Sequence, residues 1–165
     1  MSDRSAARAA ARADIRDHLV RVRAEEALAV VPSFTHADAV AIGARAFGLA
    51  VERELSCVVR VMRGDQLAFH AATTGTGPDN DAWIERKIRL VRLLQISSLQ
   101  ARLRHDIDPT DLGWVDPVAH ALHGGCIPIL MAGGAVVGTI TVSGLPDVDD
   151  HALALEAVLS HLDGR

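Results

Sequence analysis

The strongest candidate for a ligand-binding residue is His123, which directly precedes Gly124 and Gly125. An imidazole can bind a ligand or exchange a proton near neutral pH. Two residues without side chains let a small molecule approach the backbone closely. In the alternative interpretation the glycines only allow a bend, and His123 bonds to nearby backbone. We expect His123, Gly124 and Gly125 to line a ligand-binding cleft.

The same segment contains three side chains of the kind that binds zinc. His120, His123 and Cys126 recur at three-residue spacing, which would place them together on one turn of a helix. The two intervening glycines and Pro128 oppose a helix there. We therefore expect no metal site in this segment.

A basic stripe is the second candidate for ligand binding. Arg86, Arg89 and Arg92 recur every third residue, with Lys87 beside them. These cations could hold haem propionates or another small organic anion, so Arg86 and Arg89 are candidate ligand-binding residues. Ion pairs with Glu85, or with the acidic loop of a neighbouring subunit, explain the stripe equally well.

A further candidate, His70, lies in a predicted β-hairpin over residues 57–72 with a two-residue turn at Gly64-Asp65. In that register His70 lies opposite Val59, on an apolar face of the hairpin. A single histidine on such a face is more often a core residue than a ligand. Its neutral imidazole can nevertheless bind haem iron, so His70 remains a candidate.

Four helices and a second hairpin must position these residues. Residues 1–30 form a predicted helical extension outside a domain over residues 31–165. A long uncharged stretch precedes the last helix, and we expect it to form two buried strands joined by a turn at Gly133-Gly134. No membrane span is expected there.

Three more helices are predicted. The first covers 36–53, is capped by Thr35 or its neighbour, and has Val40, Ala44, Phe47 and Val51 on one face. The second is a single long helix from Ala82 to about His105, capped by Asp79, Asn80 or Asp81. The last has an apolar stripe of Leu155, Val158, Leu159 and Leu162.

The composition excludes several classes of protein. The chain has 165 residues with a formal net charge of −4, which excludes a strongly basic nucleic-acid-binding protein. Three Phe, two Trp and no Tyr provide few stacking surfaces for single-stranded nucleic acid. Two cysteines cannot build a disulfide framework, so we expect free thiols and a cytoplasmic location.

The order of the predicted elements indicates the fold class. Helices and strands follow one another as two helices, two strands, one helix, two strands and one helix. This order lacks the strand–helix alternation of a doubly wound nucleotide-binding fold. We therefore expect an α/β protein of the α+β type, with a mainly antiparallel sheet flanked by helices.

Three separated motifs stand in order along the chain: Thr76-Gly77-Pro78-Asp79-Asn80-Asp81-Ala82-Trp83-Ile84-Glu85-Arg86-Lys87, His123-Gly124-Gly125-Cys126-Ile127-Pro128-Ile129 and Val137-Gly138-Thr139-Ile140-Thr141-Val142-Ser143-Gly144-Leu145-Pro146. Together they resemble an uncharacterised branch of the haem-degrading-domain superfamily, which includes GlcG-like proteins and streptomycete haem-binding proteins. The resemblance covers residues 31–163 and implies a profilin-like fold and a homo-oligomer. It leaves the cofactor open, with haem as the candidate that the relatives suggest. One departure is Ile96-Ser97-Ser98, where the branch often has His-Ser-Ser.

The function expected from the residues and the resemblance together is binding of a small ligand, either haem or a small organic anion. Two alternatives remain open. The chain could be a homo-oligomeric module that recruits another protein, or an enzyme that acts on haem or on a small metabolite. No nucleic acid or membrane is expected as a partner.

Overall fold

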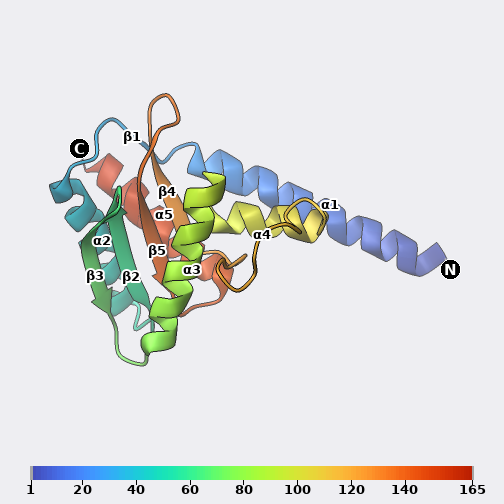
Figure 1. Ribbon diagram of the computed structural model, residues 1–165, viewed down its shortest axis with the longest axis horizontal. Coiled ribbons are helices and arrows are strands. Elements are labelled where there is room, and N and C mark those ends of the chain that lie inside the picture. The colour runs from blue at the N-terminus through green and yellow to red at the C-terminus, as the bar shows by residue number, and fades with distance from the viewer. Residues whose placement is uncertain (1, 165) are drawn as a thin grey trace.

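A mixed five-stranded sheet forms the centre of the protein, with the strand order β1-β4-β5-β2-β3 (Figure 1). The computed structural model describes residues 2–164, and side chains from residue 7 onward. Only β1 and β4 run parallel, so the predicted mainly antiparallel sheet flanked by helices is confirmed. The strands are β1 (Val30–Val31), β2 (Val58–Arg63), β3 (Gln66–Ala72), β4 (Cys126–Met131) and β5 (Val136–Ser143).

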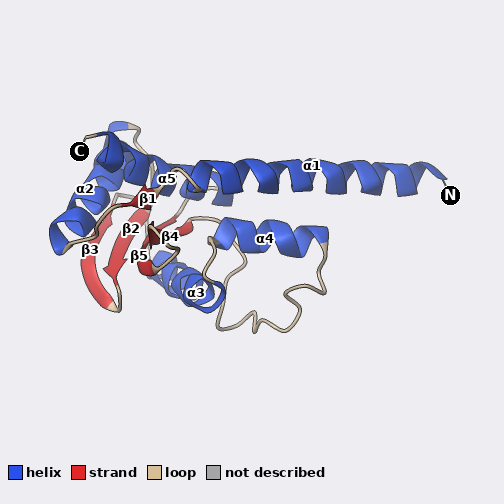
Figure 2. Ribbon diagram, turned by 90° about the horizontal axis from the view of Figure 1, so that it is seen from above, coloured by secondary structure: helices blue, strands red, loops and turns tan. Residues whose placement is uncertain are grey.

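Five helices accompany the sheet within residues 2–164. Helices α2 (His36–Glu52) and α5 (Asp147–Asp163) cover one face, and α3 (Pro78–Leu94) covers the other (Figures 1 and 2). Helices α1 (Ser2–Glu26) and α4 (Ser98–Ile107) lie side by side next to the sheet, and the first half of α1 extends past α4 (Figure 2). No helix in the described part of the chain has the length and apolarity needed to cross a bilayer.

Helix α2 begins where the sequence predicts but buries a different face. Thr35 caps it, with its hydroxyl accepting a hydrogen bond from the backbone N–H of Asp38. The predicted face is partly exposed, because Val40 and Val51 are 45% and 55% accessible. The buried face instead combines four small residues, which allow a close approach to the sheet, with two large aliphatic ones: Ala39, Gly43, Ala46 and Ala50 with Ile42 and Leu49.

The single long helix predicted from Ala82 is two helices. Helix α3 ends at Leu94 because Gln95 adopts a left-handed conformation with φ of 58°. Ser97 then caps α4, and its hydroxyl oxygen accepts a hydrogen bond from the backbone N–H of Gln100. The cap of α3 also differs from the prediction. It is Gly77, whose N–H donates to the Asn80 side chain.

The first hairpin has the predicted turn but a different register. A β-bulge at Ala68 shifts the pairing, so that His70 lies opposite Arg60 and not Val59. A shift of one residue moves a side chain to the other face of a sheet. His70 therefore lies on the polar α3 side of the hairpin, and the predicted apolar environment is wrong.

The second hairpin and the last helix follow the prediction closely. Strands β4 and β5 pair antiparallel through a turn in which Gly133 and Gly134 have positive φ values of 92° and 85°. Strand β4 ends at Met131 and β5 starts at Val136, so the turn is longer than two residues. The apolar stripe of α5 packs against the sheet core, as expected. The two-residue strand β1 was not predicted.

Candidate functional site

A small cleft lies where the first turns of α3 and α5 meet the segment that precedes β4. Its volume is about 200 Å³. Four parts of the chain contribute to it, because α3, residue 123, the end of β5 and the start of α5 all reach it. The cleft is lined by Asp79, Asn80, Trp83, Lys87, His123, Ser143, Gly144, Leu145, Asp147 and Asp150.

His123 lies at the exposed mouth of this cleft, facing Trp83. The two rings meet edge to face, with centroids 4.8 Å apart and an interplanar angle of 63°. Partial burial lowers the pKa of His123, and the positive charge of Lys87 lowers it further, against the opposing effect of Asp147. The imidazole is therefore neutral at physiological pH and offers one nitrogen lone pair.

A buried ion pair forms the inner wall of the cleft. Lys87 Nζ lies 2.8 Å from Asp150 Oδ2 and also donates to the carbonyl oxygen of Val142 at 3.0 Å. Asp150 Oδ1 accepts a hydrogen bond from the Leu145 N–H, and both charged residues are almost fully buried. Burial raises the pKa of Asp150, although Lys87 opposes this effect. The pair links α3 to α5 and fixes the end of β5 between them.

The glycines after His123 are needed for packing within the protein. A Cβ on Gly124 would lie 2.2 Å from the carbonyl oxygen of Asp147. A Cβ on Gly125, which has a φ of 116°, would lie 2.4 Å from the Val142 carbonyl oxygen and 2.8 Å from Lys87 Nζ. The close approach predicted for these two glycines is therefore made by the protein's own backbone and side chains.

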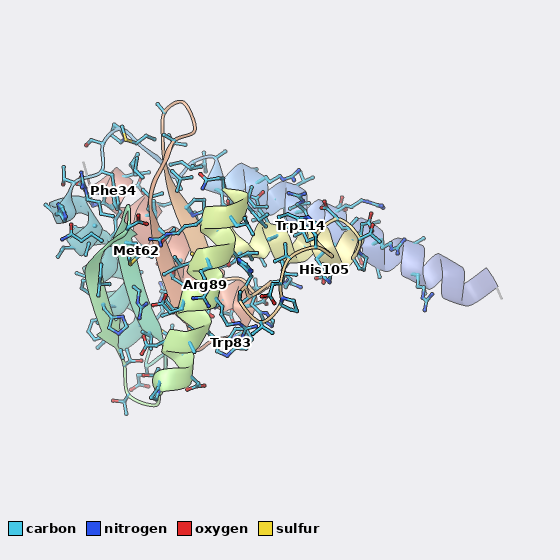
Figure 3. All side chains as sticks on the ribbon, in the orientation of Figure 1. Phe34, Met62, Trp83, Arg89, His105 and Trp114 are labelled. Atoms are coloured by element: carbon cyan, nitrogen blue, oxygen red, sulfur yellow. The ribbon has the colours of Figure 1, made fainter. Side chains whose placement is uncertain are left out.

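Of the predicted basic stripe, only Lys87 lines the cleft, and the arginines lie outside it. Arg86 donates to the Pro117 carbonyl oxygen at 2.7 Å, and its guanidinium lies 4.6 Å from the ring centroid of Trp83. Arg89 donates to the Ala119 carbonyl oxygen, also at 2.7 Å. Trp83 and Arg89 both extend from α3 (Figure 3). Arg86 and Arg89 thus bind the loop that leads to His123 and position the histidine from outside the cleft.

His70 belongs to a separate polar cluster between β2, β3 and α3. Arg60 Nε lies 3.3 Å from His70 Nδ1, and His70 Nε2 lies 3.4 Å from Asp81 Oδ1. Arg60 also forms ion pairs with Asp81 and Glu85. Glu85 is therefore the partner of Arg60, and the structure does not bring His70 together with His123.

Residues missing from the sequence prediction supply most of the charge in the cleft. The lining holds three carboxylates, those of Asp79, Asp147 and Asp150, and a single ammonium group, that of Lys87. Asp147 in turn forms an ion pair with Arg102 at 2.6 Å. The signal was present in the sequence, because both helices begin with several acidic residues. Acidic residues at the start of a helix are explained locally by the helix dipole, so their convergence on one cleft is not visible in the sequence.

The described residues provide no group of three or more side chains able to hold a metal ion. Cys126 is fully buried, and burial raises the pKa of its thiol to about 12. Its sulfur accepts a hydrogen bond from the Thr141 hydroxyl. The groups that line the cleft offer hydrogen bonds, charge and an aromatic face.

Comparison with known proteins gives a consistent family and fold. Residues 34–159 match the family described as "Haem degrading protein HbpS-like". A UPF0303 protein of Streptomyces avermitilis is 44% identical over 140 residues, which cover 83% of this chain and 86% of the relative.

Solved structures share the fold at lower sequence identity. The Ybr137w protein matches with a TM-score of 0.81 and 24% identity, covering 88% of each chain. HbpS matches with a TM-score of 0.62 and 22% identity, over 80% of this chain and 92% of that one. A structure of a PduOC:Heme complex matches with a TM-score of 0.64 and 11% identity, over 78% and 94% of the respective chains.

Proposed function

The chain belongs to the HbpS-like family of haem degrading proteins, and on this basis we propose that it binds a small ligand in the cleft beside His123. The cleft itself carries the proposal. It combines a neutral imidazole, an indole ring and several carboxylates, which are drawn from four separate parts of the chain. Concave sites with a few converging polar groups are the usual form of a small-molecule site.

The charge of the lining favours a ligand with a cationic or neutral polar head group. Asp150 is paired with Lys87 and Asp147 with Arg102, so Asp79, at the start of α3, contributes the uncompensated negative charge of the described lining. A carboxylate or phosphate entering the cleft would meet repulsion from Asp79. A primary ammonium group would gain charge-assisted hydrogen bonds, and an attached ring could pack against Trp83.

Haem is the ligand suggested by the family description, and the cleft of one chain does not fit it. A volume of about 200 Å³ is below the roughly 300 Å³ at which pockets for drug-sized ligands begin, and a porphyrin is larger than most such ligands. Asp79 would also repel its propionates. His123, with a neutral nitrogen at the mouth, is the residue of this cleft that would hold a haem iron.

The fluorescence of Trp83 provides a direct test. The only other tryptophan, Trp114, is exposed on the loop after α4, and a Trp114→Phe variant leaves Trp83 as the sole reporter. In that background we expect benzylamine to change the emission of Trp83 saturably. Benzoate, which has the same ring with the opposite charge, is expected to give no saturable change.

Two further variants connect the signal to the cleft. Asp79→Asn removes one carboxylate and is expected to weaken benzylamine binding at least about tenfold, since a hydrogen bond to a charged group contributes about 1.5–3 kcal/mol. His70→Ala is the control, because His70 lies in a different cluster. The affinity of this variant for benzylamine should be unchanged. Tighter binding of benzoate than of benzylamine would contradict the proposed ligand class. The absence of saturable binding by both would contradict the binding function.

Hemin is tested separately by its absorption spectrum. We expect the Soret band of hemin added to the purified protein to remain that of free hemin. A shifted, saturable Soret band that is lost in a His123→Ala variant would show that haem binds at the mouth and would overturn the interpretation based on charge and volume.

A further inference from the structure

A second, larger hollow lies between α1 and α5, away from the His123 cleft. Its volume is about 410 Å³, within the usual range for small-molecule sites, and its surface is mainly apolar. Leu28 is 68% exposed and Val148 is 40% exposed along this hollow, so large apolar side chains remain in contact with solvent. The α1–α5 groove is lined by His18, Val22, Glu25, Leu28, Leu99, Val148, His151, Ala152, Leu155, Glu156, Leu159, Ser160 and Asp163.

His151 is the unusual residue of this groove. Only 3% of it is exposed, and neither ring nitrogen has a hydrogen-bond partner in the described structure. Its Nε2 lies 3.6 Å from Glu26 Oε1, beyond hydrogen-bond distance, and the two Glu26 oxygens accept from Ser97 and Gln100 instead. A buried polar group without a partner costs about 1–3 kcal/mol, and such groups in proteins commonly await a ligand or a water molecule.

The charges around the groove limit the ligand class. Burial keeps the His151 ring neutral, with one nitrogen able to accept a hydrogen bond. Glu25, Glu156 and Asp163 add acidic groups to the lining, although Glu156 is paired with Arg53. These carboxylates disfavour an anionic head group, and the apolar walls favour a hydrocarbon or aromatic body.

We propose that the α1–α5 groove is a binding site for a small neutral or cationic amphiphile, whose apolar body packs between the two helices and whose N–H or O–H group donates to His151. This site is distinct from the His123 cleft. Its occupant does not depend on the ligand proposed there, so either proposal can fail without the other.

The probe for this site is N-phenyl-1-naphthylamine, a neutral aromatic molecule with a single N–H donor whose fluorescence rises in apolar surroundings. We expect saturable binding to the full-length protein, with one probe per chain. His151→Phe keeps the apolar volume but removes the acceptor, and is expected to weaken binding about fivefold. Ala152→Trp places an indole in the groove from the exposed side of α5 and is expected to weaken binding at least tenfold.

The matched control places the same indole in a different hollow. Val51 lines a separate cavity beside β3, together with Phe47 and Leu55. Val51→Trp should leave probe binding unchanged. The proposal is wrong if the native protein shows no saturable binding, or if Val51→Trp and not Ala152→Trp abolishes it. If the native protein does not bind the probe and the Ala152→Trp variant has a lower mass in light scattering than the native protein, a second copy of the chain covers the groove and the proposal is wrong.

Discussion

The walls of the His123 cleft are held in place by tightly packed residues. Gly125 is the clearest case, since its missing side chain makes room for Lys87 Nζ and for the carbonyl oxygen of Val142. The Lys87–Asp150 pair then connects two helices that are 63 positions apart at these residues. Losing one partner of a buried pair is costly, because the remaining charge stays unpaired.

We expect Gly125→Ala to lower the free energy of unfolding by about 3 kcal/mol, from the clash and from the positive φ together. Gly133→Ala is the control, because Gly133 also has a positive φ but a methyl group added there would have no atom within 4 Å. Its cost should be about 1 kcal/mol. Urea denaturation measures both values, and equal losses would show that the clash relaxes freely.

The titration of His151 predicts a specific loss of stability in acid. Burial lowers the pKa of His151 to about 4, so between pH 6.5 and 4 the unfolded chain binds a proton that the native state refuses. Stability therefore falls as the pH falls through this window. Burial raises the pKa of Glu26, which acts in the opposite direction and stays in place when His151 alone is replaced.

Between pH 7 and 4.5, the wild-type protein should lose about 2 kcal/mol more stability than a His151→Phe variant. Urea unfolding of both proteins at the two pH values measures this difference. Parallel losses in the two proteins would show that His151 is protonated in the native state.

At the scale of the helices and strands, α1 and α4 are joined by both apolar and polar contacts. Leu19 and Val22 of α1 pack against Leu99 and Leu103 of α4. The Glu26 carboxylate at the end of α1 accepts from the Ser97 hydroxyl at 2.5 Å and from the Gln100 amide at 2.6 Å. Ser97 thus caps α4 and holds the end of α1 at the same time.

Ser97→Ala should cost about 2 kcal/mol, the sum of a lost cap and a weakened partner for a buried carboxylate. Thr35→Ala removes the exposed cap of α2 and should cost only about 1 kcal/mol. Hydrogen exchange gives the second readout. Amides in residues 15–26 should exchange faster in the Ser97 variant only, and unchanged exchange there would contradict the link between α1 and α4.

Local chemistry explains which elements the sequence could predict. Thr35 before α2 and Gly64-Asp65 between β2 and β3 act over a few residues, so both were found. The break at Gln95 was missed because the surrounding residues favour a helix, although Ser97 was a readable cap signal. The bulge at Ala68 leaves no mark in the alternation of side chains.

The candidate site was less predictable than the fold. His123 could be singled out because it lies next to two glycines, and the structure places it at the cleft. The Lys87–Asp150 pair depends on how α3 and α5 approach the sheet from different parts of the chain. No spacing in the sequence encodes that approach. The assignment of ligand-binding roles in this cleft remains a proposal.

At the scale of the whole molecule, we propose that residues 1–30 are an extension through which copies of the chain associate. Residues 7–14 are exposed throughout in a single chain, yet they continue the helix. Tertiary packing supplies most of the stability of helices in proteins, and this stretch has none within one chain, so packing against another copy would stabilise it.

Light scattering should therefore give a multiple of 17.5 kDa for the full-length protein and a smaller mass for a variant that lacks residues 2–14. When both proteins are diluted until they are monomeric, the variant and the full-length protein should have similar melting temperatures. A full-length protein that scatters as a monomer would contradict the proposal.

The projecting part of α1 also makes the protein useful as a molecular ruler. A helix rises 1.5 Å per residue, so positions 7 to 14 span about 10 Å along a line leading away from the sheet (Figure 1). Dyes attached at successive turns of this stretch would sit at graded separations from an acceptor on the body. Energy transfer from these dyes to the acceptor would then change when a neighbouring molecule bends or encloses the projecting part of α1.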